Sequence, residues 1–290
     1  MKRRSILAYA GLSAACAMSS GAAMGQAMIV DHGCTDISQV PANYIEKAKE
    51  TFKVAYGHTS HGSQIVSGMN ALRKSNPDLF GFSRAGGKEL SLFDTTPPGD
   101  LGNPDRSTWA QRTRDLLAVP GGDRNLIMWS WCGQAGSASE KDIQLYLDLM
   151  SGLEKEFPKV KFVYMTGHLD GSGKTGNLNL RNEQIREFCR KNGKILFDFA
   201  DIESFDPDGK VNFMELGAAD SCDYRKEGVT RNWADEWLQK NPGHGIALPD
   251  SAAHSRPLNG ALKGRAFWWM MARLAGWDGK APAAKPVRGD

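Results

Sequence analysis

Two polar segments that lie far apart in the sequence carry the residue types needed for nucleophilic catalysis. Ser60 lies in a Gly-His-Thr-Ser-His-Gly segment that begins at Gly57, and His254 ends an Asp-Ser-Ala-Ala-His segment that begins at Asp250. A serine hydroxyl attacks a carbonyl carbon when a histidine takes its proton, and an acid commonly orients that histidine. We interpret Ser60 as a candidate nucleophile, His254 as its base and Asp250 as the orienting acid. A serine before a helix is also a common N-cap, so the interpretation depends on the pairing with His254.

Three further histidines lie in similar loops. His58 and His61 flank Ser60, and His168 follows another apolar run. We interpret these three as candidate substrate-binding residues, with ordinary polar loop positions as the alternative. The spacing His-x-x-His is also a weak metal signal, but no carboxylate spacing supports it. No metal ion or other cofactor is therefore expected.

The elements that must position these residues follow from alternating apolar patterns. The strands are predicted at residues 52–56, 125–131, 160–165 and 194–199, and the helices at 41–51, around 65–72, and at 107–117, 140–157, 182–192 and 262–274. Residues 81–105 are rich in Gly and Pro and are predicted to form a long loop. The alternation predicts one α/β domain, a three-layer α/β/α sandwich with a mostly parallel sheet. In such sheets the active site lies beyond the carboxyl ends of the strands, where the histidine-bearing loops begin.

The order of these motifs resembles the SGNH (GDSL-type) hydrolase superfamily over residues 52–277. In that family a serine follows the first strand, an Asp-x-x-His pair precedes the last helix, and a glycine and an asparagine complete the oxyanion hole. The resemblance implies a flavodoxin-like sheet with Ser60 as nucleophile and His254 as base, the latter in a His-Ser-Arg-Pro-Leu-Asn-Gly run similar to the family's His-Pro-Asn-x-x-Gly. It also implies that Gly102 supplies a backbone N–H and that Gln134 or Asn103 replaces the family's asparagine.

The chain departs from the family pattern in its first block and in its acid. The first block reads Gly-His-Thr-Ser where the family has Gly-Asp-Ser, and Asp250 is one residue further from His254 than the family's acid. The chain is thus expected to be a divergent member.

The N-terminal segment predicts export. Lys2, Arg3 and Arg4 precede a short apolar stretch and a small-x-small pattern at residues 25–27, as in a signal peptide covering residues 1–27. Residues 28–290 then form a periplasmic or secreted domain, and a lipid anchor at Cys16 is the alternative. No other stretch is long and apolar enough to span a bilayer. A net charge of +3 without a basic, aromatic-rich block gives no sign of a nucleic-acid partner.

Four cysteines remain after residue 27, and an oxidising compartment permits them to pair. They are Cys34, Cys132, Cys189 and Cys222. Cys189 shares one helical face with apolar residues and is predicted to be a buried thiol. We predict a disulfide between Cys132 and Cys222.

Residues 204–215 overlay a calcium-binding loop except at the first position, where a serine stands. The Asp-Pro-Asp-Gly sequence inside this segment is also an ordinary turn. Both interpretations stay open at this point.

Three functions are compatible with these patterns. The first is a serine esterase or deacylase acting on a small-molecule or polysaccharide substrate. Exposed tryptophans near the site would favour an acylated carbohydrate; the candidates are Trp109, Trp129, Trp131 and Trp233. The second is a polysaccharide lyase or glycosidase that uses Tyr56, His58, His61, His168 and Arg256. The third is a non-catalytic glycan-binding module that uses the tryptophans.

Overall fold

A seven-stranded sheet organises the computed structural model, which describes residues 26–280. Its strands are β1 (Met28–Val30), β2 (Lys53–Gly57), β3 (Phe82–Ser83), β4 (Leu90–Asp94), β5 (Leu126–Trp129), β6 (Lys161–Met165) and β7 (Ile195–Phe197). They lie in the order β1-β7-β6-β5-β2-β4-β3, and every neighbouring pair is parallel. The five strands β4-β2-β5-β6-β7 have the flavodoxin-like order 2-1-3-4-5, which β1 and β3 extend at the two edges. The strand order therefore reverses between β2 and β5, which is the position at which sheets of this kind bind their ligands.

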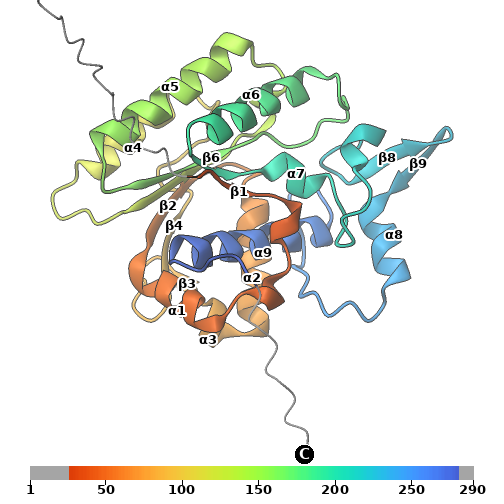
Figure 1. Cartoon of the computed structure of the whole chain (residues 1–290), viewed down its shortest axis with the longest axis horizontal. Helices are drawn as coiled ribbons and strands as arrows, with labels where there is room; N and C mark the ends of the chain where they lie inside the picture. Colours follow the sequence, from red (N-terminus) through yellow and green to blue (C-terminus); the bar gives the residue numbers. More distant parts are fainter. Residues whose placement is uncertain (1–25, 281–290) are drawn as a thin grey trace, which may run out of the picture.

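Helices cover both faces of this sheet, which confirms the predicted three-layer α/β/α sandwich (Figure 1). One face carries α1 (Ala42–Thr51), α2 (Ser63–Ser75), α3 (Pro77–Phe80) and α9 (Pro257–Leu274), and the other carries α4 (Thr108–Leu117), α5 (Glu140–Glu156) and α6 (Asn177–Lys191). A separate hydrophobic cluster fills each interface. All four residues of β5 are buried because the strand is covered on both sides, which explains its continuous apolar sequence.

The helix α5 shows how local sequence defines an element. The Ser139 side chain accepts a hydrogen bond from the backbone N–H of Asp142, and the Asp142 side chain accepts one from the backbone N–H of Ser139. This capping box satisfies two N–H groups that the first turn of a helix leaves without partners. The buried residues Ile143, Leu147 and Met150 then follow at helical spacing.

The helices α2 and α9 touch backbone to backbone. A Cβ atom on Gly68 would lie 2.0 Å from the carbonyl oxygen of Gly260, and one on Gly264 would lie 2.2 Å from the carbonyl carbon of Gly68. Only glycine permits such an approach. Because Ser60 lies three residues before α2 and His254 lies three residues before α9, this contact sets the separation of the two segments.

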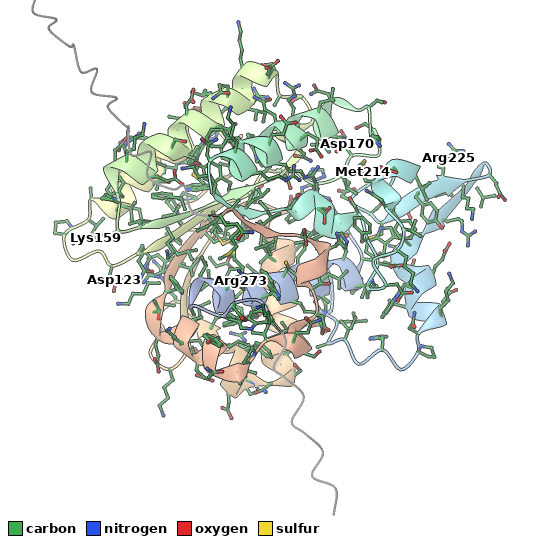
Figure 2. All side chains as sticks on the ribbon, viewed as in Figure 1. Asp123, Lys159, Asp170, Met214, Arg225 and Arg273 are labelled. Carbon is green, nitrogen blue, oxygen red and sulfur yellow. The ribbon has the colours of Figure 1, made fainter. Side chains whose placement is uncertain are left out.

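The remaining elements gather at the carboxyl edge of the sheet. They are α7 (Phe199–Glu203), the antiparallel hairpin of β8 (Asp223–Lys226) and β9 (Val229–Asn232), and α8 (Trp233–Lys240), with short 3₁₀ helices at His32–Cys34, Ile37–Gln39, Gly133–Ala135 and Phe213–Leu216. In Figure 2, Asp123 and Lys159, which precede β5 and β6, lie at one end of the sheet. Asp170, which follows β6, lies at the other end, towards Arg225 in the hairpin. The hairpin thus stands beside the edge where the candidate site residues are expected.

The structure corrects the prediction that residues 81–105 form a long loop. This segment contains β3 and β4, and β4 pairs with β2 in the sheet. Leu90 and Leu92 are buried, but an apolar pattern this short among Gly and Pro residues does not distinguish a strand from a loop. The elements β1, β8, β9 and α8 were also not predicted. The predicted signal peptide, residues 1–27, lies outside the described residues except for its last two positions. The alternative lipid anchor at Cys16 also lies outside them.

Candidate active site

Ser60 lies in a sharp turn between β2 and α2, at the carboxyl end of β2 where the strand order reverses. A Cβ atom on Gly57 would lie 2.3 Å from the ring of Trp129, and one on Gly62 would lie 2.4 Å from the Cβ of His58. Both glycines are therefore required for the turn. Ser60 is exposed, and α2 has no side-chain N-cap, so the N-cap interpretation of Ser60 is wrong. Its hydroxyl is left free for another partner.

That partner is His254, as the sequence patterns predicted. The Nε2 atom of His254 lies 3.0 Å from the Oγ of Ser60, although the residues are 194 positions apart. His254 has a φ of 62°, in the left-handed region that non-glycine residues seldom adopt. The carbonyl oxygen of Ala253 accepts a hydrogen bond from Gln64 Nε2 at 2.6 Å, which anchors the turn. Backbone strain held in place by surrounding contacts is a frequent property of functional sites.

Asp250 does not orient His254, so this part of the prediction is wrong. Its carboxylate pairs with Lys74 Nζ at 2.6 Å, and its side chain is 88% exposed. This ion pair holds the Asp250 carboxylate against α2, which contains Lys74. No carboxylate lies within ion-pair distance of His254 in the part of the chain that the structure describes.

A second constellation lies beside Ser60 and was not predicted. His61 Nδ1 lies 2.9 Å from Cys132 Sγ, and His61 Nε2 lies 2.9 Å from Asp220 Oδ2. Cys132 Sγ is 3.7 Å from Ser60 Oγ. Burial would raise the pKa of Asp220, but the hydrogen bond from His61 and the nearby charges of His168 and His61 outweigh it and lower this pKa. Asp220 is therefore ionised near neutral pH.

His61 is the middle ring of a stack of three imidazoles. The His61 and His168 ring centroids are 3.6 Å apart with an interplanar angle of 4°, and the His61 and His254 centroids are 4.4 Å apart with an angle of 13°. His61, His168 and Asp220 lie close enough together to be considered as metal ligands. However, ring nitrogens bind a metal in the plane of the ring at about 2.0–2.1 Å, and two parallel rings cannot both direct an in-plane lone pair at one ion. The stack therefore favours acid–base chemistry over metal binding.

The other predicted binding residues are held by neighbouring groups. His58 is buried and pairs through Nε2 with Asp94, at the end of β4. The Gly102 N–H donates to Asp100 Oδ1 at 2.8 Å, so it is not free for an oxyanion. The structure thus places neither residue as predicted.

Gln134 and Asn103 differ in their relation to the site. Gln134 Oε1 accepts a hydrogen bond of 3.0 Å from the Cys132 N–H, so Gln134 supports the backbone of the thiol. Asn103 is exposed and forms a backbone bridge with Asp100. The Asn103 side chain has no hydrogen bond to any described residue, and nothing brings it to Ser60.

A buried polar network anchors the loops that carry the histidines. Glu203 Oε2 accepts from the Leu169 N–H at 2.7 Å, and Glu203 Oε1 accepts from Lys263 Nζ at 2.6 Å. Lys263 also donates to the Gln64 side chain, whose amide holds the carbonyl of Ala253. Burial lowers the pKa of the Lys263 ammonium, and the charge of Glu203 acts in the opposite direction. The network joins the loop of His168 to the loop of His254.

The predicted disulfide between Cys132 and Cys222 is absent, and all four cysteines of residues 26–280 are free thiols. The Cys222 thiol is buried against the hydroxyl of Ser255, at 3.5 Å, while Cys132 faces His61. The prediction that Cys189 is a buried thiol is confirmed. Counting cysteines suggested a pair, but the strand ends place Cys132 in the site.

The tryptophans singled out by the sequence belong to the core. Trp109, Trp129, Trp131 and Trp233 are all buried. None of the four therefore offers an exposed ring on which a sugar could stack.

The structure also favours the turn over the calcium site at residues 204–215. Asp206 Oδ1 accepts from the N–H groups of Asp208 and Gly209, and Glu215 pairs with Lys174. These acidic side chains are not gathered around a common point among the described residues.

A separate acidic and imidazole cluster lies at the ends of β1 and β7. His32 Nδ1 is 2.6 Å from Asp201 Oδ1, and the His32 ring stacks on Phe205 with centroids 3.7 Å apart. The hydrogen bond that the His32 ring donates to the Asp201 carboxylate raises the pKa of His32. For Asp201, burial acts to raise the pKa, but the hydrogen bonds from His32 outweigh it and lower the pKa. The pair links α7 to the edge of the sheet.

Comparison of the chain with protein-family models, with curated proteins and with solved structures finds no match. The resemblance to SGNH hydrolases therefore stays a prediction. None of the helices in residues 26–280 combines the length and the apolar composition that crossing a bilayer requires.

Proposed function

We propose that this chain is a serine hydrolase of acyl esters, of SGNH type, in which Ser60 is the nucleophile and His254 is the base. The observation that carries the proposal is the 3.0 Å contact between His254 Nε2 and the exposed Ser60 hydroxyl. A histidine at this distance is within reach of the hydroxyl proton. The residues meet at the carboxyl ends of parallel strands, where α/β enzymes bind their substrates.

The reaction proceeds by acyl transfer to serine and then to water. Ser60 Oγ attacks the ester carbonyl carbon while His254 Nε2 takes the hydroxyl proton, which requires that Nδ1 carries the ring's own proton. The imidazolium returns its proton to the leaving alcohol as the C–O bond breaks. Water then hydrolyses the acyl-serine with the same base.

Backbone N–H groups in the turn are suited to hold the oxyanion. The N–H groups of Ser60 and His61 have no acceptor among the described residues. In acyl-transfer enzymes, N–H groups at and just after a nucleophilic serine on a strand-to-helix turn stabilise the tetrahedral intermediate. They take the role that the sequence assigned to Gly102.

The pair works without an orienting carboxylate. Stacking on His61 and the anchored turn at Ala253 restrict the His254 ring instead. Because a carboxylate also stabilises the imidazolium, we expect slower turnover than a complete triad gives.

The proposal specifies the reaction, hydrolysis of an acyl ester, and the compartment, but it does not specify the alcohol part of the substrate. The buried tryptophans remove the argument for a carbohydrate, so a small ester and an acylated polysaccharide are both retained as substrates. The predicted signal peptide places the activity outside the cytoplasm.

Most of the residues on which the two alternative functions depend are buried or paired with other side chains. Burial raises the pKa of the Tyr56 hydroxyl, which opposes its use as a proton-abstracting group. His58 is paired with Asp94, and Arg256 with Asp235. A lyase or glycosidase site on these residues is therefore disfavoured, as is a glycan-binding surface built from the tryptophans.

Labelling with a fluorophosphonate probe tests the proposal. The wild-type chain should be labelled at Ser60, Ser60→Ala should show no labelling, and His254→Ala should slow labelling by at least about 10²-fold because the base is lost. Asp250→Asn is the matched control and should be labelled like the wild type. Labelling that persists in Ser60→Ala, or a folded wild type that is not labelled, would refute the serine mechanism.

A further inference from the structure

The constellation of Cys132, His61 and Asp220 is a complete nucleophile, base and acid arrangement that the serine mechanism does not use. Its two contacts are both 2.9 Å long and use opposite nitrogens of one ring. Cys132 lies three residues after the end of β5, and His61 lies four residues after the end of β2, so the group lies at the same edge of the sheet as Ser60.

The contact with Asp220 determines which ring nitrogen of His61 acts as the base. An ionised carboxylate only accepts hydrogen bonds, so the ring proton must be on Nε2. The Nδ1 lone pair then faces Cys132 Sγ and can take the thiol proton. A carboxylate on the far nitrogen also stabilises the imidazolium that forms.

Asp220 is itself held in place by the backbone. Its Oδ1 accepts from the Ser221 N–H at 2.8 Å, and its own N–H donates to the Leu169 carbonyl at 3.1 Å. The carboxylate therefore keeps one oxygen directed at His61. The lowered pKa described above keeps it charged.

The other thiols of the described chain lack these features. Burial raises the pKa of Cys34 and of Cys222 to about 12, and it also raises the pKa of Cys189. Among the cysteines of residues 26–280, only Cys132 is partly exposed, and a thiolate beside an imidazole is the reactive form of cysteine.

We infer that Cys132 is a second nucleophile of this site, with His61 as its base and Asp220 as the positioning residue, and that it takes acyl groups as thioesters. Its sulfur attacks the carbonyl carbon of an ester, and the thiol proton passes through His61 Nδ1 to the leaving alcohol. The C–S bond forms as the C–O bond breaks, and water then hydrolyses the thioester to the acid and the free thiol. The inference goes beyond the proposed serine mechanism, because it stands even if Ser60 is inert.

The position of Ser60 explains how one substrate site serves both nucleophiles. Ser60 Oγ and Cys132 Sγ are 3.7 Å apart, so a carbonyl carbon bound beside this pair of atoms lies within reach of either. Acylation of Cys132 is therefore best observed in the Ser60→Ala background.

The test uses the full chain with p-nitrophenyl acetate, an acid quench and peptide mass spectrometry. In Ser60→Ala we expect an acetyl group on Cys132 that neutral hydroxylamine removes, as it does for thioesters. Adding His61→Gln should abolish this acetylation. If Ser60→Ala carries no acetyl group on Cys132, the inference is overturned, whether or not fluorophosphonate labels Ser60 in the wild type.

The rate of alkylation by iodoacetamide, followed from pH 5 to pH 9, measures the activation directly. We expect Cys132 to react first and its rate at pH 6 to fall at least about tenfold in His61→Gln. Asp220→Asn should move the pH profile upwards, because the imidazolium loses its counter-charge. Asp170→Asn is the matched control, since Asp170 lies in the adjoining loop and binds Ser172 instead. Equal rates in all four proteins, with near-ultraviolet circular dichroism showing that they are folded, would overturn the inference.

Discussion

Replacing Lys263 by methionine should cost this protein a large part of its stability. The Lys263 and Glu203 side chains are both 0% exposed and are joined at 2.6 Å. Methionine keeps the length of the side chain but leaves the Glu203 carboxylate without a counter-charge. Removing one partner of a buried ion pair typically costs about 3–5 kcal/mol, which is a large share of the roughly 5–15 kcal/mol that stabilises a folded domain.

The double variant provides the critical comparison. In Glu203→Gln with Lys263→Met the buried charge is gone, while the amide oxygen still accepts the Leu169 N–H that Glu203 holds at 2.7 Å. We expect the double variant to be more stable than Lys263→Met alone by about 2 kcal/mol, within the range of coupling found between contacting residues.

Equilibrium unfolding in urea, followed by tryptophan fluorescence, measures these differences. The buried Trp268 in α9 lies on the same helix as Lys263 and reports its unfolding. A loss below about 1 kcal/mol in Lys263→Met, or a double variant no more stable than the single one, would refute the reasoning. Such a result would also contradict the inference that this buried network anchors the loops of His168 and His254.

Three further outcomes are expected. Asp250→Asn should hydrolyse esters at close to the wild-type rate and should keep a free energy of unfolding within about 0.5 kcal/mol of the wild type, because this exposed side chain does not touch the site. A loss of turnover above about tenfold would contradict this expectation. Gly264→Ala should cost about 1–3 kcal/mol in urea unfolding and should slow Ser60 labelling, because a methyl group there collides with Gly68 and separates α2 from α9; unchanged labelling would show that this contact does not set the geometry. His32→Gln should lower stability mainly between about pH 4 and pH 6.5. The raised pKa of His32 gives stability that is lost as pH rises through that pKa, and the lowered pKa of Asp201 gives stability that is lost as pH falls through it. Wild-type and variant unfolding curves that differ equally at pH 5.5 and pH 9 would speak against the pair.

The predicted orienting acid shows where inference from sequence fails. Asp250 was chosen because it is the carboxylate nearest to His254 in the sequence, yet it pairs with Lys74. Asp220, which does bind a site histidine, lies 159 residues from His61. It reaches the site because its N–H pairs with the Leu169 carbonyl, in a segment without any apolar periodicity. No local sequence pattern predicts such a contact.

Cys132 is a second example of this limit of sequence-based inference. Its predicted disulfide followed from the number of cysteines and the expected compartment, which say nothing about direction. The structure turns Cys132 towards His61, because β5 ends at the same edge of the sheet as β2 and Gln134 holds the Cys132 backbone there. A site that the sequence presented as serine-centred therefore contains a thiol as well.

The amino-acid pattern was sufficient for the fold class, for six of the nine α-helices in residues 26–280, for the strands β2, β5, β6 and β7, and for the approach of Ser60 to His254. These depend on the periodic burial of side chains and on the rule that parallel strands end at one edge, and both can be read over short windows. The strand β4, the place of Asp220 and the orientation of Asp250 were decided only by tertiary packing. A hydrogen bond requires two atoms within about 3 Å, and that distance depends on loop paths and side-chain directions that distant elements impose.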